Sequence, residues 1–184
     1  MFNERKVAQM AAFLLAKEDG HMAHLKLMKL LYLSDREAMD RYGAPLSGDH
    51  MVSMPHGPVL SMTLNLMDGD VESSKGGWES WITAKANHEL SVVSDVQPGQ
   101  LDELSPADIE VLEAVWAKFG YMGKYQIRDY THDHCAEWED PHGSSNPIAY
   151  EKVFVALGRS KDQAAELAAT IETGKTLDRL FATL

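Results

Sequence analysis

The side chains best suited to metal binding or acid–base chemistry are concentrated between residues 129 and 142. This stretch contains three histidines, the single cysteine and five carboxylates: Asp129, His132, Asp133, His134, Cys135, Glu137, Glu139, Asp140 and His142. On a helix, His132 and Cys135 would lie on one face and could share a metal ion. His134, however, would point away from His132, and no second group of ligands has zinc-site spacing. We therefore predict no metal and no cofactor, and interpret the stretch as a solvated helix end with one buried histidine.

Cys135 beside a histidine is the one arrangement that could provide a nucleophilic thiol. Its acidic neighbourhood raises the pKa of a thiol and so disfavours the thiolate. Motifs of serine hydrolases, phosphate-binding loops and zinc proteases are absent from the sequence. His56-Gly57-Pro58 would either place an imidazole at a helix start, where anions bind, or form a tight turn into a helix. We predict that the chain is not an enzyme; a small metal-dependent hydrolase using the cluster around His132 is the alternative.

The composition is that of an ordinary globular protein. The chain has 184 residues, of which 45% are hydrophobic and 24% charged, and this length suits one domain over residues 1–184. Its apolar stretches are too short to span a bilayer, and its first residues lack the pattern of a signal peptide. A single cysteine cannot form an intramolecular disulfide. We expect a cytoplasmic protein with no membrane partner.

The net charge of −11 is unevenly distributed along the chain. Residues 1–60 carry seven basic and seven acidic side chains, whereas residues 61–184 carry ten and twenty-one. Such an excess repels phosphate backbones, so nucleic-acid binding by this chain alone is disfavoured. It would attract a basic partner, and the acids within Asp95–Glu113 are then candidates for the contact. General solubility is the other explanation of the acidity.

The elements that must position these side chains are mostly helices. Apolar periodicity predicts helices over residues 4–18, 24–42, 58–67, 106–119, 124–137 and 148–157 and from 161 onwards. Gly43 is suited to end the second helix, and Ser105-Pro106 to start the fourth. Residues 78–86 and 90–94 have strand character around a turn at 87–89. The predicted fold class is mainly α: a compact helical domain with a small antiparallel β-hairpin inserted.

Methionine is concentrated at the start of the chain, with nine of the ten residues within positions 1–67. Methionine side chains adapt to irregular partners, so Met51, Met54, Met62 and Met67 could form an apolar docking face. Filling of an irregular core is the preferred interpretation.

Three motifs of the first half resemble the opening of a known family. They are Leu27-Met28-Lys29-Leu30-Leu31-Tyr32, then Tyr42-Gly43-Ala44-Pro45-Leu46, then His56-Gly57-Pro58-Val59. Together they are similar to the signature of the Panacea domain, the SocA-like antitoxin family. Looser similarity follows in the second half, at the helix start Leu104-Ser105, over residues 121–131, and at Thr131-His132 with Trp138. The resemblance covers residues 5–157, and Cys135 with the acids after it departs from the pattern.

This resemblance implies a mostly helical, non-catalytic antitoxin that binds a toxin encoded beside it. In the SocA branch, the antitoxin is implied to be a proteolytic adaptor that delivers the toxin SocB to the protease ClpXP. Elsewhere in the family, neutralisation by a direct, occluding complex is implied. The residues of this chain do not distinguish the two modes. The expected partners are therefore a SocB-like cognate toxin and, for an adaptor, ClpXP.

Six motif side chains are the predicted binding residues: Lys29, Tyr32, Asp35, Arg36, Tyr42 and His56. The competing interpretation is structural, since the two tyrosines would also suit a core and Lys29 would suit an ion pair.

Overall fold

The computed structural model describes residues 1–181 and, for Pro98, the backbone alone. Seven α-helices occur in this range: α1 (Glu4–Ala16), α2 (His24–Tyr42), α3 (Ser61–Asp68), α4 (Pro106–Phe119), α5 (Lys124–His134), α6 (Tyr150–Ala156) and α7 (Lys161–Phe181). The strands are β1 (His21–Ala23), β2 (Met51–Met54), β3 (Gly57–Leu60), β4 (Glu89–Ser91) and β5 (Asn146–Pro147). Short 3-10 helices span Trp78–Ser80 and Pro98–Gln100. The mainly α class is confirmed, but the β content is two small antiparallel sheets, ordered β1-β4 and β3-β2-β5.

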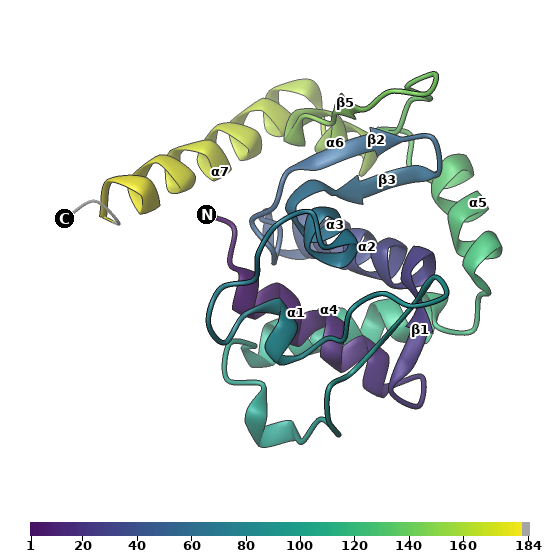
Figure 1. Cartoon of the computed structure of the whole chain (residues 1–184). Helices are drawn as coiled ribbons and strands as arrows, with labels where there is room; N and C mark the ends of the chain where they lie inside the picture. The colour runs from purple at the N-terminus through teal and green to yellow at the C-terminus, as the bar shows by residue number, and fades with distance from the viewer. Residues whose placement is uncertain (182–184) are drawn as a thin grey trace.

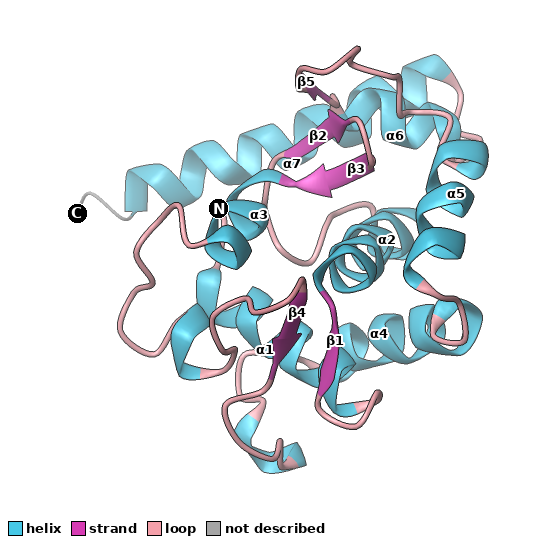
Figure 2. Cartoon of the chain, turned by 45° about the vertical axis from the view of Figure 1, so that its right-hand side comes forward, coloured by secondary structure: helices cyan, strands magenta, loops and turns pink. Residues whose placement is uncertain are grey.

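Helix α2 lies at the centre of the molecule (Figure 1). It contacts α1 and α4 on one side, the β3 strand on the other, and α5 along its flank. Helix α6 and the long α7 pack on each other at the far side of the β2–β3 hairpin (Figure 2). The surrounding helices and strands therefore pack against α2 or against the β2–β3 hairpin that covers it.

The sequence of α2 explains its central position. Its first half is buried nearly all round, including the polar residues Lys26 and Lys29, and Asp35 is buried further along. The helix ends at the predicted place because Gly43 adopts a φ of 75° and donates its N–H to the Met39 carbonyl at 3.0 Å. The predicted span of 24–42 is confirmed.

The two helices α1 and α4, which pack against α2, start at side-chain caps. Asn3 accepts a hydrogen bond from the Lys6 N–H at 3.1 Å and so caps α1. At α4, Ser105 Oγ accepts from the Asp108 N–H at 3.2 Å, and the Asp108 carboxylate accepts from the Ser105 N–H at 2.8 Å. This reciprocal capping confirms the predicted start at Ser105-Pro106.

The antiparallel pairing predicted for residues 78–86 and 90–94 is confirmed, but the predicted extent of the first strand is wrong, because Trp78–Ser80 is a 3-10 helix. Strand β4 pairs with β1, and the central pair of that ladder, Met22 and Leu90, is buried. The two predicted segments are joined by the bridges Ile82–Val92 and Ala86–Glu89. The N–H groups of Thr83 and Val93 also donate to the carbonyls of Ser91 and Trp81, at 2.9 and 2.8 Å. Residues 78–86 nevertheless form no continuous strand. Burial is the reason, because residues 83–89 are exposed and offer no apolar face for a longer ladder.

The predicted helix start at Pro58 is also wrong. Residues 57–60 form β3, paired antiparallel with β2, and the helix begins at Ser61. Its cap comes from a distant residue: the Asp49 carboxylate accepts from the N–H groups of Met62 at 3.0 Å and Thr63 at 2.8 Å. Local spacing cannot predict this cap, because Asp49 precedes the β2–β3 hairpin and the helix begins after it.

Burial decides several smaller expectations. Met51 and Met67 are buried in the core, and Met54 packs against it, which supports core filling over an apolar docking face.

Helix α5 ends at His134, three residues before the predicted end, because the chain turns at Cys135 to bring Glu137 against α2. The start of α7 at Lys161 is as predicted.

Gly57, the first residue of β3, has no room for a side chain. Its φ is +93°, and a Cβ there would lie 2.8 Å from Thr131 Oγ1 and 2.9 Å from Lys29 Nζ. We expect Gly57→Ala to lower the free energy of unfolding by about 2–5 kcal/mol, from backbone strain plus overpacking. Chemical denaturation measures this loss.

Gly158→Ala is the matched control, because Gly158 has a φ of +89° and a Cβ added there would meet nothing within 4 Å. It reports the backbone strain alone, about 1–2 kcal/mol. Equal losses in the two variants would contradict the packing argument for Gly57.

Candidate functional site

The three motif segments converge on one side of α2. The Lys29 ammonium, wholly buried, donates to the Pro58 carbonyl of β3 at 2.7 Å. Because β3 is an edge strand of its sheet, this carbonyl is available to a side chain. The lysine of the first motif thus holds the Gly-Pro step of the third motif against α2.

Burial lowers the pKa of Lys29 to about 7, and the nearby Arg128 acts in the same direction while Cys135 opposes it. An amine in this position is neutral above that pH and needs no counter-charge. The ion pair expected for Lys29 is replaced by a hydrogen bond to a backbone carbonyl.

Tyr32 and Arg36 hold a buried carboxylate. The Tyr32 hydroxyl donates to Glu137 Oε1 at 2.7 Å, and Arg36 Nε donates to the same oxygen at 2.7 Å. The Glu137 side chain is wholly buried, whereas Arg36 keeps partial contact with solvent. Burial opposes the charge of Arg36, but the hydrogen bond and charge of Glu137 outweigh it and raise the pKa of the guanidinium. The cluster ties the segment after α5 to α2.

Asp35, about 60° around α2 from Tyr32, binds the loop that precedes β2. Its carboxylate accepts from the Ser47 N–H at 2.9 Å and also from the Ser47 hydroxyl. Ser47 Oγ accepts in turn from the Asp49 N–H at 3.0 Å, which positions Asp49 to cap α3. Burial raises the pKa of Asp35 to about 7 even though the hydrogen bonds from Ser47 oppose the shift. This residue organises the loop rather than presenting a charge to solvent.

Tyr42 and His56 are the two predicted binding residues that are exposed. Tyr42 lies at the end of α2, whereas His56 lies in the β2–β3 turn, near the start of α2. Lys29 marks the level of the β2–β3 turn on α2, because it contacts Pro58, two residues after His56. From Lys29 to Tyr42 the helix rises by thirteen residues, or about 20 Å. The six predicted residues therefore do not form one surface: Lys29, Tyr32 and Asp35 are internal, Arg36 is half-buried, and the exposed pair is separated.

The histidine and cysteine near the end of α5 do not form a nucleophilic pair. Burial raises the pKa of Cys135 to about 12, with Glu137 adding to the effect. The His132 ring stacks on Trp138 with centroids 4.1 Å apart, and its buried Nε2 has no hydrogen-bond partner within residues 1–181. Over the same residues, no three His, Cys, Asp or Glu side chains are grouped as metal ligands. The sequence predicts a solvated helix end with one buried histidine. In the structure His132 is half-buried and His134 is exposed, whereas Cys135 and Glu137 are buried.

The acidic segment proposed to attract a basic partner is largely paired within the chain. Four ion pairs join it to the N-terminal helix: Arg5–Asp102 at 3.2 Å, Arg5–Glu103 at 3.2 Å, Lys6–Asp108 at 3.0 Å and Lys17–Glu113 at 2.6 Å. All three basic residues lie on α1 or its C-cap. Three cations therefore offset part of the charge of the six acids in this segment, and the paired acids join α1 to α4.

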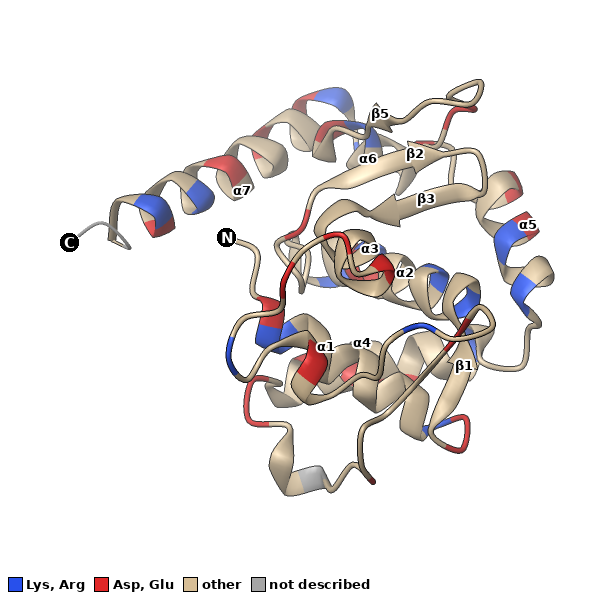
Figure 3. Cartoon of the chain, viewed as in Figure 1, with Lys and Arg blue, Asp and Glu red and all other residues tan. Residues whose placement is uncertain are grey.

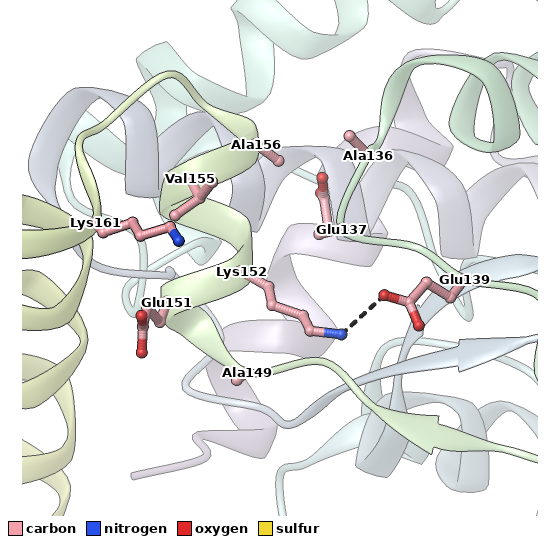
Figure 4. A pocket seen from close by; sticks show the side chains of 9 residues that line it. All are labelled: Ala136, Glu137, Glu139, Ala149, Glu151, Lys152, Val155, Ala156 and Lys161. Carbon is pink, nitrogen blue, oxygen red and sulfur yellow. Dashed lines mark hydrogen bonds and ion pairs between the residues drawn. The ribbon is translucent and has the colours of Figure 1, made fainter.

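An open groove of about 540 Å³ lies between α6 and the segment after α5. Lys152 reaches from α6 to Glu139 at 2.9 Å across it (Figure 4). Glu137 contributes to its wall, but the Glu137 carboxylate is occupied by Tyr32 and Arg36. Both glutamates on this side of the groove therefore have partners within the chain.

The fold is thus a mainly α protein whose motif side chains are used to join segments to a central helix. A family model described as the SocA-like antitoxin, Panacea domain, matches residues 27–139. The match covers more than half of the chain, and the chain belongs to this family. The curated proteins and the solved structures contain no match to it. Among the helices of residues 1–181, none is long and apolar enough to cross a membrane.

The matched region corresponds to the contacts described above. It begins within α2 and ends just after Glu137 and Trp138, so it contains both partners of the Tyr32–Glu137 bond. Trp138 closes the same region by donating Nε1–H to the Met54 carbonyl at 3.0 Å. Helices α6 and α7 lie outside the match.

Sequence reasoning missed Glu137, Ser47 and Asp49 as partners of the motif residues. Glu137 was recognisable only as one acid of a dense group, and its burial depends on where α5 ends. Ser47 follows the Pro45 turn, where a local cap is typical, but nothing in the local pattern indicates a contact with α2. A buried tyrosine or arginine does predict that an acceptor must exist, although not which residue provides it.

The Tyr32–Glu137–Arg36 cluster can be tested by isosteric substitutions. We expect Tyr32→Phe to lower the free energy of unfolding by about 1–2 kcal/mol, because one buried hydrogen bond is lost. Glu137→Gln should cost about 3 kcal/mol, because the charge of Arg36 is left without its partner. Tyr42→Phe, at an exposed position, is the control and should change stability by less than about 0.5 kcal/mol. A loss for Glu137→Gln as small as that of the control would show that the buried pair contributes nothing.

Lys29 should produce a distinctive dependence of stability on pH. Its pKa is about 7 in the folded chain against an ordinary 10.5, so between these values the unfolded chain binds a proton that the folded chain does not. The folded state therefore gains stability as the pH rises through this window. We compare the free energy of unfolding of the natural chain with that of Lys29→Met at each pH. The difference, natural chain minus variant, should rise by roughly 1–4 kcal/mol between pH ~7 and ~10.

The control is Lys75→Met, because Lys75 is exposed in a loop. The difference between this variant and the natural chain should stay constant over the same pH range. Denaturation at several pH values measures both, and parallel curves for the two variants would contradict a neutral buried Lys29.

Proposed function

We propose that this protein is an antitoxin that binds and neutralises a toxin encoded beside it. The observation that carries the proposal is the family match over residues 27–139, which includes α2, the hairpin and the segment after α5. The polar motif residues in this region support a binding role rather than catalysis, since their functional groups are occupied by contacts within the chain.

Within this proposal, the six motif side chains contribute in two ways. Tyr42 and His56 are exposed and would contact the toxin, with Arg36 accessible in part. Lys29, Tyr32 and Asp35 are buried and would act by fixing the shape of the surface that the others present. Because Tyr42 and His56 lie towards opposite ends of α2, a toxin contacting both would have to cover the length of this helix.

Two modes of neutralisation follow from family membership. In one, the toxin is SocB-like and the antitoxin delivers it to ClpXP in the cytoplasm. In the other, a stable complex blocks the toxin without proteolysis. The adaptor mode requires a second surface for the protease, and the two ends of α2 are far enough apart to provide separate contacts.

Co-expression with the product of the adjacent gene tests the proposal. Growth and the half-life of the neighbouring protein are followed in cells with and without ClpXP. Rescue of growth that requires ClpXP, together with loss of the neighbour, supports an adaptor. Rescue without ClpXP, with a complex that co-purifies, supports occlusion. A neighbour that is not toxic and forms no complex contradicts the antitoxin proposal.

Surface variants then locate the contact. We expect Tyr42→Ala or His56→Ala to weaken rescue and co-purification at least ~10-fold, as loss of an aromatic contact at an interface commonly does. Tyr121→Ala and His142→Ala are the matched controls, because both residues are exposed and lie outside the motifs. Thermal denaturation of each variant separates loss of contact from loss of folding. Full activity of both motif variants would exclude these residues from the interface.

A further inference from the structure

A cavity of about 330 Å³ opens where the first turns of α2 and α5 meet. Five basic or titratable nitrogen-bearing side chains line it, together with Tyr125: His24, His56, His88, Lys124 and Arg128. No aspartate or glutamate lines the cavity, although the chain as a whole carries a net charge of −11. The cavity is therefore a local concentration of positive charge on an acidic protein.

The two permanent cations of this cavity are held by one aromatic ring. Lys124 Nζ and the Arg128 guanidinium lie 5.3 and 5.1 Å from the centre of the Tyr125 ring. Arg128 also contacts the exposed Asp129 at 2.6 Å, whereas Lys124 forms no ion pair in the part of the chain that the structure describes. Helix α5 carries its basic residues towards its start and its acids towards its end (Figure 3). One full cationic charge is thus uncompensated at this site.

Histidines from three separate segments complete the wall. The His24 Nδ1–H donates to the His88 carbonyl at 2.9 Å, and the two rings stack with centroids 5.6 Å apart. His56 reaches the cavity from the β2–β3 turn. With Nδ1 of His24 committed to a carbonyl, Nε2 is the ring nitrogen that remains for a ligand.

The backbone adds to the positive field. Neither α2 nor α5 has an acid in its first turn, and neither N-cap residue provides a side-chain hydrogen bond to the first-turn N–H groups. Each helix start therefore contributes its partial positive charge without compensation. The side chains define the site, and the helix starts strengthen it.

We propose that this cavity binds a small phosphate-bearing molecule. A phosphate group accepts hydrogen bonds through three or four oxygens, which suits donors that arrive from several directions, whereas a carboxylate has two oxygens. The volume suits a compact ligand, and the net negative charge of the chain disfavours a long nucleic-acid backbone. The cavity shares His56 with the proposed toxin contact. Phosphate binding is measured on this chain alone, so either proposal can fail without the other.

Titration of the full chain followed by amide NMR tests the site, with inorganic phosphate and AMP as probes and acetate as the comparison, at constant ionic strength. We expect saturable shifts confined to residues around His24, His88 and Lys124–Arg128. Tighter binding of AMP than of phosphate would support the site and indicate that the cavity also contacts the organic part of the ligand. Equal affinities would support recognition of the phosphate group alone. Acetate binding as tightly as phosphate would overturn the assignment of the ligand class.

Charge-matched variants make the test specific. Lys124→Gln with Arg128→Gln should weaken phosphate binding at least ~10-fold, and the exposed Lys124→Glu alone should do the same if Arg128 proves necessary for folding. Lys75→Gln with Lys118→Gln removes the same charge from exposed positions outside the cavity and should alter affinity less than about twofold. Equal losses in the two double variants, or shifts that never saturate, would overturn the proposal.

Discussion

The buried carboxylate of Glu137 is the contact on which the central part of the structure depends. A charge removed from water is tolerated only when donors surround it, and here Tyr32 and Arg36 both donate to the same oxygen. Because the donors lie on α2 and Glu137 lies after α5, satisfying this group forces the chain to turn at Cys135. The same turn brings Trp138 to the Met54 carbonyl and closes the β2–β3 hairpin against α2. Polar contacts, in addition to apolar packing, therefore fix how α2, the segment after α5 and the β2–β3 hairpin are arranged.

A second polar chain joins the C-terminal helices to this centre. The Tyr150 hydroxyl donates to the Asp49 carbonyl at 2.8 Å, and Lys175 of α7 donates to the Tyr150 oxygen at 2.6 Å. Asp49 in turn caps α3 and is positioned by Ser47, which Asp35 of α2 holds. Helices α6 and α7 lie outside the region matched to the family, yet they are connected to α2 through this path. The matched region is thus the centre of a larger polar network.

The internal use of these polar groups bears on function. Three of the motif side chains, Lys29, Tyr32 and Asp35, are buried and engaged in contacts within the chain. Tyr42 and His56 are the exceptions among the predicted residues, and they lie far apart. The acidic excess is likewise reduced where α1 supplies cations to the α4 layer. Among the six predicted residues, Tyr42 and His56 are therefore the ones whose side chains are exposed, with Arg36 accessible in part.

The sequence by itself determined most of the helices, the caps of α2 and α4, and the family. Apolar periodicity and capping act within about four residues, so the span of α2, the Gly43 end and the Ser105 start were readable from local spacing. Only the tertiary structure decided the pairing of β4 with β1, the capping of α3 by Asp49 and the burial of Glu137. The cavity at the start of α2 also assembles histidines that are 64 residues apart, from His24 to His88. These contacts join residues that are far apart in the sequence. The local sequence shows that a buried polar side chain needs a hydrogen-bond partner, but it does not show which residue provides it.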